Sequence, residues 1–423
     1  MSIDRGVARY FGFSAPSHTV QREITLPKGD FVLAIVGPRR AGKTTYLLQV
    51  MERLPVPKSN KVFVNGEDVN FEGMTAKDLD ALEESIFRVY SPDTTKDIYL
   101  LIDEVQNFPS WARWVRTLHD ERAYKIIMTG STSELNSERL PSALRGRSLN
   151  TLVLPFSFKE YLKAKGVNIH EHLAPKNAGT LSSHAVTFIQ QGGYPAAVLS
   201  EDSASKLKIL QELYEGVMQR DIIDKYGVRK RETFRVFMNA LLGSACRPLS
   251  ATSIAGWLAG HGLELTRQAA LNYIRFAESV FLVFRLYPYS RKPRERKVAP
   301  KVYASDSGLL GLVSADESKK LENQVFIELL RRGEQMHYWR SRQSRREVDF
   351  VLGKGGGGEL IQVSYDLGDP ATYRRETDAL LESSQELGIS NLTIITMNEE
   401  REVHEAGRRM AVVPAWKWLL GFE

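Results

Sequence analysis

The chain has 423 residues, 43% of them hydrophobic and 26% charged, and this composition excludes a largely disordered protein. One ordinary hydrophobic core is too small for this length, so about two to four domains are expected. The formal net charge of +6 is modest, and the single cysteine, Cys246, excludes an intramolecular disulfide and a multi-cysteine metal site.

The N-terminal segment shows no secretion signal. Met1–Val20 contains no continuous apolar stretch of the kind that a signal peptide needs. Nowhere does an uncharged apolar run approach the ~20 residues that span a bilayer. The sequence therefore predicts a cytoplasmic protein without a membrane partner.

Short apolar runs alternate with helical patterns over the first third of the chain. The predicted strands are Phe31–Val36, Val62–Asn65, Ile98–Ile102, Lys125–Met128 and Leu149–Leu154, and the predicted helices include Thr44–Arg53, Leu79–Arg88 and Trp111–Asp120. Strands that alternate with helices predict an α/β fold with a parallel sheet.

A phosphate-binding loop follows the first of these strands. Residues 37–44 read Gly-Pro-Arg-Arg-Ala-Gly-Lys-Thr and match G-x-x-x-x-G-K-[ST] between a predicted strand and a predicted helix. Backbone N–H groups and the helix N-terminus favour phosphate oxygens there, Lys43 supplies a point charge, and the Thr44 hydroxyl can ligate magnesium. The predicted nucleotide-binding residues are Gly37, Pro38, Arg39, Arg40, Ala41, Gly42, Lys43, Thr44 and Thr45.

An acidic pair ends the predicted strand Ile98–Ile102. Asp103 and Glu104 stand where the carboxyl end of a central strand lies beside the phosphate loop. Asp103 is expected to hold magnesium, and Glu104 is expected to orient and activate the attacking water. A simple strand-end turn is the alternative for this pair, but its occurrence together with the loop favours a nucleotide site.

Two further polar positions can belong to the same site. Thr129, followed by Gly130 and Ser131, ends another predicted strand, where a hydroxyl can position the lytic water or sense the γ-phosphate. A turn at the strand end is the alternative. Arg147 precedes the last strand of the sheet, where ring-forming ATPases can place an arginine that reaches a neighbour's γ-phosphate; an ordinary surface arginine is the alternative.

After Pro155 the pattern becomes helical. The expected helices are Phe158–Lys165, His184–Gln191, Ala204–Tyr226 and Glu232–Leu242, interrupted by a turn at Gly192-Gly193-Tyr194-Pro195. From Leu249 two short helices and a longer one are expected, followed by two strands, Val280–Leu286 and Lys301–Ala304. This order, with a basic tract between the two strands, is that of a winged helix-turn-helix.

The last hundred residues predict a small α/β domain. The expected elements are a helix at Leu321–Arg332, strands at Val348–Leu352 and Leu360–Ser364, a helix at Tyr373–Leu387, a strand at Leu392–Thr396 and a terminal segment at Trp416–Leu420. No internal repeat and no long linker is visible.

Several of these motifs resemble those of prokaryotic, mainly archaeal, ATPases of the AAA+ superfamily. The resemblance rests on residues 36–45, on Leu100–Gln106, on Thr129-Gly130-Ser131, on Gly192–Pro195, and on Lys301-Val302-Tyr303 with Asp306-Ser307-Gly308-Leu309. It covers essentially the whole chain. It implies an AAA+ core, a helical lid, a winged helix, a C-terminal domain similar to restriction endonucleases, ATP as the nucleotide, and oligomerisation as a possibility.

Positive charge is concentrated in the C-terminal half. Arg285–Lys301 holds seven basic residues against one acidic, and Arg331–Arg346 holds six against one. A polyanion can dock on such segments, although solvated charge runs are the alternative. Within the winged helix, Thr266 is expected to cap a helix that buries Leu271, Ile274 and Ala277. The DNA-binding candidates are Arg267, Gln268, Asn272, Arg275, Arg291, Lys292 and Arg294.

The last domain is similar to the PD-(D/E)XK nuclease pattern, which needs acidic metal ligands and a lysine. The matching positions are Glu322 on a helix, Asp349 on a strand and Gln362 on the next strand, but Ser364 stands where the lysine is required. Lys354 is an alternative source of that charge. Without the lysine a major electrostatic partner of the transition state is missing, so a relic nuclease site is expected. The alternative makes Glu322 a surface carboxylate and pairs Asp349 with Arg345 or Arg346.

Together these features predict four domains: an ATPase core (1–155), a helical lid (156–245), a winged helix (246–315) and an endonuclease-like domain (316–423). The predicted function is magnesium-dependent ATP hydrolysis coupled to a DNA-associated C-terminal half, in a possible homo-oligomer. Two alternatives stay open, an ATP-gated protein-docking switch without DNA and an ATP-dependent nuclease.

Overall fold

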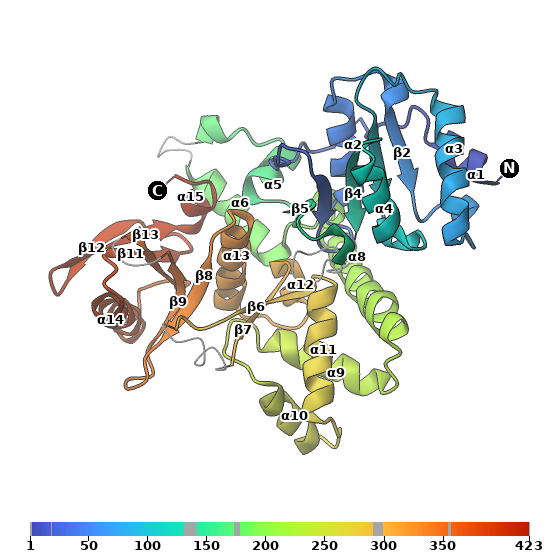
Figure 1. The fold of residues 1–423 in the computed structure, drawn as a ribbon. Coiled ribbons are helices and arrows are strands. Elements are labelled where there is room, and N and C mark those ends of the chain that lie inside the picture. Colours follow the sequence, from blue (N-terminus) through green and yellow to red (C-terminus); the bar gives the residue numbers. More distant parts are fainter. Residues whose placement is uncertain are drawn as a thin grey trace. The chain divides into compact units, whose positions relative to one another are not determined.

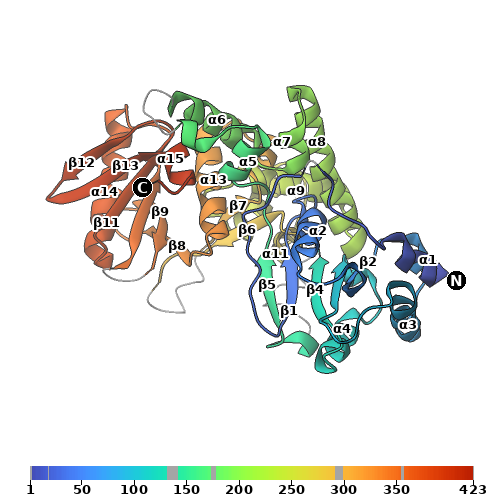
Figure 2. The ribbon, with the colours of Figure 1, turned by 90° about the horizontal axis from the view of Figure 1, so that it is seen from above.

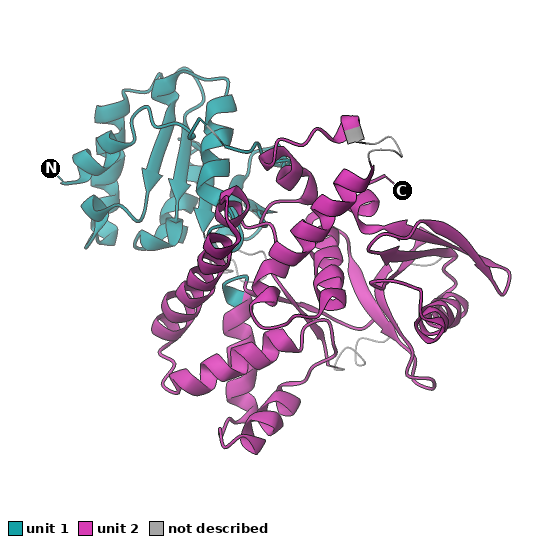
Figure 3. Cartoon of the chain, turned by 180° about the vertical axis from the view of Figure 1, so that it is seen from behind, with its two compact units in different colours: residues 1–154, 279–281 teal, residues 155–278, 282–423 magenta. Residues whose placement is uncertain are grey.

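The computed structural model describes residues 2–17, 19–130, 142–172, 178–290, 299–353 and 357–422. The chain divides into two compact units, shown in Figure 3. Unit 1 contains residues 1–154 with 279–281, and unit 2 contains residues 155–278 with 282–423. The division into four domains stays a prediction.

Unit 1 is built on a five-stranded sheet in the order β2-β3-β4-β1-β5. Figures 1 and 2 show this sheet with the helices beside it. Its strands are β1 (Val32–Val36), β2 (Lys61–Asn65), β3 (Tyr99–Asp103), β4 (Lys125–Gly130) and β5 (Ser148–Leu152). Every pairing is parallel, from β2 with β3 through to β1 with β5. The predicted α/β fold with a parallel P-loop sheet is confirmed.

The strand order decides which side chains can meet. Because β4 lies between β1 and β3, the carboxyl ends of these three strands are neighbours at one edge of the sheet. Ile35 of β1, Leu101 of β3 and Ile127 of β4 are buried in one apolar core together with Tyr46 and Leu47 of the following helix. That core fixes the loop after β1 and the acidic pair after β3 relative to each other.

Helices flank this sheet. They are α1 (Ser2–Arg9), α2 (Lys43–Arg53), α3 (Leu79–Tyr90) and α4 (Trp111–Asp120). The first was not expected from the sequence; it lies beside α3, where Asp4 accepts hydrogen bonds from Ser85 and Arg88. Short 3₁₀ segments occupy Lys58–Asn60, Val69–Phe71, Ala76–Asp78, Val105–Asn107 and Ser142–Leu144.

Unit 2 begins with a helical block. Its helices are α5 (Phe158–Ala164), α6 (Ala178–Gln191), α7 (Pro195–Leu199), α8 (Ser203–Gly216) and α9 (Arg231–Gly243), with a 3₁₀ turn at Ile169–His172. A capping box between Ser157 and Glu160 starts α5. The single helix expected over Ala204–Tyr226 is interrupted, because α8 continues into a π-helical segment at Val217–Asp224.

Two sequence motifs that are far apart in the chain meet in unit 2. Asp306 caps α12 (Ser307–Gly311) by accepting from Gly308 N at 2.8 Å, and its other oxygen accepts from Gly193 N at 2.7 Å. Burial raises the pKa of Asp306 to about 6. Gly192 has φ +78°, and a Cβ there would lie 1.8 Å from Asp306 Oδ1, so this position requires glycine.

A helical pair and a hairpin follow. After Leu249 the structure has one short helix, α10 (Ala251–Gly260), and one longer helix, α11 (Arg267–Ser279), so the expectation of two short helices before the longer one was wrong. A third helix, α9, precedes α10 and α11 in the chain. The strands β6 (Val283–Leu286) and β7 (Lys301–Ala304) pair antiparallel, as expected for the hairpin.

The C-terminal part of unit 2 contains a six-stranded mixed sheet in the order β12-β13-β11-β10-β9-β8. The strands are β8 (Met336–Arg340), β9 (Glu347–Leu352), β10 (Glu359–Val363), β11 (Asn391–Thr396), β12 (Arg401–Glu405) and β13 (Arg408–Pro414), and the helices are α13 (Glu317–Arg331), α14 (Pro370–Leu387) and α15 (Ala415–Leu419). Both α13 and α14 pack on β10. The strands β8, β12 and β13 were not predicted.

Among the described residues, no helix combines the length and the apolar composition that a bilayer crossing needs.

Candidate nucleotide-binding site

The loop after β1 has the backbone that the phosphate-binding pattern requires. Gly37 has φ +149°, and a Cβ at this position would lie 2.1 Å from the Val153 carbonyl oxygen. Gly42, at the start of α2, has φ +94°, and Arg40 also has a positive φ of 59°. Residues with side chains are strained at such angles, so Gly37 and Gly42 allow the chain to turn tightly between β1 and α2.

Lys43 lies inside this loop. Its side chain is buried, and its ammonium donates to the carbonyl oxygens of Gly37 at 3.1 Å and Pro38 at 3.0 Å. These contacts hold the ammonium at the mouth of the loop, where it can pair with phosphate oxygens of a nucleotide.

Three hydroxyl and carboxylate groups meet beside the loop. Thr44, the second residue of α2, donates to Asp103 Oδ2 at 2.8 Å, and Thr129 at the end of β4 donates to Asp103 Oδ1 at 2.5 Å. Burial raises the pKa of Asp103, while the two hydroxyls oppose that shift. Hydroxyl and carboxylate oxygens are the donors that magnesium prefers, so this set fits Mg²⁺.

Glu104 follows directly, in a left-handed conformation with φ 48° and ψ 54°. Its N–H donates to Thr129 Oγ1 at 2.9 Å, and its carboxylate accepts from Gln106 Nε2 at 2.5 Å. The two carboxylates have different partners, since that of Asp103 accepts from Thr44 and Thr129 and that of Glu104 accepts from Gln106. Thr129 therefore contacts both acidic residues of the motif.

Arg147 does not join this group in its own chain. It precedes β5, whose first residue pairs with the first residue of β1, whereas the phosphate loop follows the last residue of β1. Its guanidinium donates to Asp120 at 3.0 Å on the surface of unit 1. A role toward a neighbouring chain stays a prediction, and Ser131 lies outside the described residues.

One supporting residue escaped the sequence reasoning. Arg22 is buried, and its guanidinium donates to the carbonyl oxygens of Ala41 at 2.8 Å and Leu154 at 2.6 Å. It therefore links the phosphate loop to the end of the sheet. No local signal marks it, because Leu154 is 132 residues away.

The residues of the nuclease pattern also come together, in unit 2. Glu322 of α13, Asp349 of β9 and Gln362 of β10 line a cavity of 510 Å³. A residue that the pattern did not include, Lys301 of β7, contacts Asp349 at 2.7 Å and Glu322 at 3.1 Å. Lys354 lies outside the described residues.

Lys301 and the carboxylates around it shift one another's pKa values. Burial by itself lowers the pKa of Lys301, but the surrounding carboxylates of Asp349, Glu322 and Glu347 raise it well above its usual range. Burial and the nearby Asp349 raise the pKa of Glu322. The alternative that pairs Asp349 with a neighbouring arginine was wrong for Arg346, which instead contacts Asp378 and Glu382.

The DNA-binding candidates lie on α11 or outside the described residues. Arg267, Gln268 and Arg275 are exposed, and Asn272 is half-buried and accepts from Gln268 at 3.2 Å. Thr266 caps the helix through Ala269 N, as expected. The buried face of α11 differs from the expected one at Leu271, which is only half-buried. Ala270 and Tyr273 are buried together with the expected Ile274 and Ala277. The described residues do not include Arg291, Lys292 and Arg294.

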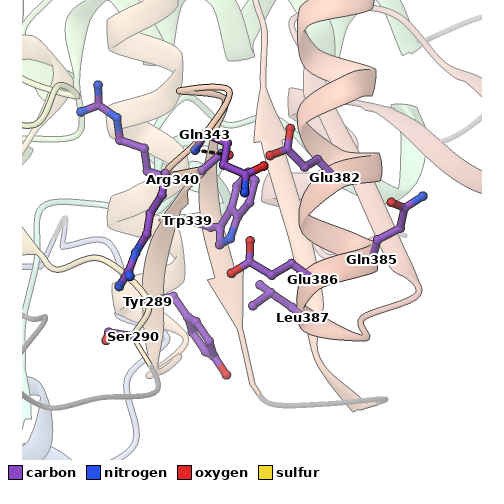
Figure 4. A pocket seen from close by; sticks show the side chains of 11 residues that line it. Tyr289, Ser290, Trp339, Arg340, Gln343, Glu382, Gln385, Glu386 and Leu387 are labelled. Atoms are coloured by element: carbon purple, nitrogen blue, oxygen red, sulfur yellow. Dashed lines mark hydrogen bonds between the residues drawn. The ribbon is translucent and has the colours of Figure 1, made fainter.

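A second cavity in unit 2, of 690 Å³, lies between α14 and the β8–β9 turn. Figure 4 shows Glu382 and Glu386 extending from α14 toward Trp339 and Gln343. Among the described residues, none of those predicted to bind nucleotide, metal or DNA lines this cavity.

Three segments of the chain match family models. Residues 30–162 match an AAA domain, residues 183–320 a domain of unknown function (DUF8612), and residues 318–418 another domain of unknown function (DUF4143). The AAA match supports nucleoside triphosphate hydrolysis as the activity of unit 1. The other two descriptions state no activity, so the winged helix and the endonuclease-like domain stay predictions.

Similar solved structures include a Walker-type ATPase of Pyrococcus abyssi, at 14% identity and a TM-score of 0.44 over 74% of this chain and 94% of that chain. The Orc1 protein of Aeropyrum pernix in complex with DNA has 14% identity and a TM-score of 0.26 over 72% of this chain and 89% of that chain. At these scores neither likeness carries a functional argument.

Relatives extend over nearly the whole chain. A protein of Haemophilus influenzae, described as uncharacterized, is 28% identical over 86% of this chain and 88% of its own length. An uncharacterized protein of Methanocaldococcus jannaschii is 32% identical over 92% of this chain and 88% of its own length. The chain therefore belongs to the family of this Methanocaldococcus jannaschii protein, and it carries an AAA domain at residues 30–162.

Proposed function

We propose that this protein hydrolyses ATP with magnesium and uses the nucleotide state to control a C-terminal half that associates with DNA. The observation that carries the hydrolysis proposal is the contact of Asp103 with both Thr44 and Thr129 beside the glycine-rich loop. A loop of this sequence also occurs in proteins that bind nucleotide without fast turnover. The acidic pair and its hydroxyl partners are what hydrolysis requires in addition.

Each residue has a distinct task in this proposal. Lys43 pairs with the phosphate oxygens, and the N–H groups of the loop and of α2 complete the phosphate cradle. Thr44 and Asp103 would hold magnesium, which would supply positive charge against the negative charge of the phosphates. Glu104 orients the attacking water and accepts its proton, while Gln106 holds its carboxylate and Thr129 holds its backbone N–H.

Two variants test the assignment. Lys43→Ala removes the phosphate contact, so tight binding and hydrolysis are both expected to disappear. Glu104→Gln keeps the shape and the hydrogen-bond partner of the side chain, so ATP binding is expected to persist while turnover stops. The measurement is nucleotide affinity by fluorescence titration together with phosphate release, with Glu67→Gln, an exposed acidic residue of unit 1, as the control. Hydrolysis by Glu104→Gln at the parent rate would show that Glu104 is not the catalytic residue.

Exposed polar and basic residues of α11 support the DNA part of the proposal. Arg267, Gln268 and Arg275 are accessible on one helix, and these side chains suit contacts with phosphates and base edges. Binding that depends on phosphate contacts falls linearly with salt on a logarithmic scale. Arg267→Glu with Arg275→Glu should therefore weaken DNA binding and flatten this slope, whereas the same change at Arg53, an exposed arginine of unit 1, should not.

The ATP-gated docking switch differs from this proposal in one measurable way. ATP turnover should rise with single-stranded, duplex or branched DNA if the C-terminal half acts on DNA. A rate that no DNA changes, together with an unchanged salt slope in the α11 variant, would favour a protein partner instead. Assembly into homo-oligomers is part of the proposal, because an arginine such as Arg147 can complete only a neighbour's site.

A further inference from the structure

The acidic cluster of unit 2 contains its own cation. Lys301 projects from β7 into the C-terminal sheet region, where its side chain is 1% exposed. Its ammonium contacts carboxylate oxygens of three residues, Asp349 at 2.7 Å, Glu347 at 2.9 Å and Glu322 at 3.1 Å. An ammonium group has three N–H donors, so one carboxylate oxygen is available for each of them.

Further hydrogen bonds engage Asp349, Glu322 and Gln362. Asp349 Oδ2 accepts from Val363 N at 3.0 Å, and Glu322 Oε1 also accepts from the Tyr303 hydroxyl at 2.8 Å. The amide oxygen of Gln362 accepts from Asp349 N at 3.2 Å, and its Nε2 donates to Glu376 at 2.5 Å. The three side chains of the nuclease pattern thus already have protein partners on the oxygens that face one another.

A divalent ion does not fit this arrangement. Magnesium requires oxygen ligands at about 2.0–2.1 Å in near-octahedral geometry, and it binds one or two carboxylates directly. Here the space between Asp349 Oδ1 and Glu322 Oε1 is taken by the Lys301 ammonium, and Gln362 points its oxygen at a backbone N–H. A carboxylate cluster needs a positive partner when it is buried, and in this domain the chain supplies it.

We infer that the Lys301 ammonium occupies the position that a divalent cation holds in metal-dependent nucleases, so that this domain keeps the acidic cluster without binding metal. The inference goes beyond the proposed ATPase function and does not depend on it. It also differs from a nuclease in which lysine assists a bound metal, because such a lysine leaves the carboxylates free to coordinate. The cluster then serves to join β7 to α13 and β9 and not to hold metal for cleavage.

A gain of metal binding provides the test. All proteins carry Asp103→Asn, which silences the carboxylate of the nucleotide site. Mn²⁺ binding is followed by electron paramagnetic resonance and by thermal unfolding in the parent, in Lys301→Met, and in Lys301→Met combined with Asp349→Asn. The matched control is Lys319→Met, a lysine of the same cavity whose ammonium donates to the Gly243 carbonyl oxygen and not to a carboxylate.

The expected result is that Lys301→Met binds Mn²⁺ at least about tenfold more tightly than the parent and is stabilised by it, because three carboxylates are left without their cation. This gain should vanish with Asp349→Asn and be absent in Lys319→Met. If Lys301→Met unfolds without metal, recovery of its fold by Mn²⁺ is the same result. Binding of Mn²⁺ by the parent in an Asp349-dependent manner would overturn the inference, as would a Lys301→Met variant that neither binds Mn²⁺ nor is refolded by it.

Discussion

Arg22 offers the sharpest test of how the phosphate loop is held in place. Its guanidinium is buried and donates to Ala41 O at 2.8 Å and Leu154 O at 2.6 Å. A hydrogen bond to a charged group contributes about 1.5–3 kcal/mol, so Arg22→Met should cost the loop about 3–6 kcal/mol. Methionine retains most of the apolar stem but leaves both carbonyl oxygens without this donor.

The lost stability of the loop should appear first as faster opening of residues 37–43 and as weaker nucleotide binding. Because the chain has two compact units, a single unfolding temperature does not report on one loop, whereas hydrogen exchange of the amides in residues 37–43 does. If binding has to reorder the loop, the lower limit of 3 kcal/mol corresponds to a loss of about 100-fold in ATP affinity. The exchange rates and the ATP affinity of Arg22→Lys should lie between those of the parent and those of Arg22→Met. An ammonium keeps the positive charge but lacks the planar fork of the guanidinium.

A control separates this effect from the loss of one positive charge. Arg53 is exposed at the end of α2, so Arg53→Met changes the net charge equally without touching the loop. Exchange rates and ATP affinity of Arg53→Met should match those of the parent. If Arg22→Met also exchanges within twofold of the parent across residues 37–43, the two carbonyl contacts do not stabilise the loop and the reasoning is wrong.

Three further predictions address other contacts. Thr129→Val removes a hydroxyl that lowers the pKa of the buried Asp103, so the pKa should rise further and ATPase activity should be lost at a higher pH on the acidic side of a pH–rate profile. If Arg147 completes a neighbour's site, a mixture of Arg147→Ala and Lys43→Ala chains should regain activity that neither has alone, and no recovery at any ratio would indicate a mechanism within one chain. Gly192→Ala should lower the unfolding temperature of unit 2 far more than Gly262→Ala. Both glycines have positive φ, but only at position 192 would a Cβ lie against Asp306. Equal losses would show that backbone strain alone, and not the contact with Asp306, determines the loss of stability.

That the phosphate loop and Asp103 lie side by side could be predicted because each motif is local in sequence. The loop of residues 37–44 and the pair Asp103 and Glu104 each follow a continuous apolar strand, and a parallel sheet brings the ends of such strands to one edge. Thr129 was found for the same reason. The pattern also predicted the element type correctly, because buried parallel strands are apolar on both faces.

Strands at the edges of the second sheet were missed because their sequences are not apolar. In β12 only Val403 is buried, and β8 mixes His337 and Arg340 with aromatic residues. The turn between β12 and β13 uses Ala406 and Gly407, both with positive φ, which is the geometry of a two-residue hairpin turn. Alanine rarely adopts such angles, so residues 406–407 do not match the usual sequence pattern of a hairpin turn.

Lys301 shows a different limit of motif reasoning. A nuclease pattern looks for its lysine two residues after the third ligand, and Ser364 at that position indicates a lost charge. In the structure the positive charge of the cluster comes from Lys301 of β7, which lies 48 residues before Asp349 in the chain. Such a contact depends on how a hairpin packs against another sheet, which no spacing rule contains. Ser364 at the position of the pattern's lysine therefore does not mean that the cluster lacks a cation, and the position of Lys301 between the carboxylates argues against metal-dependent cleavage.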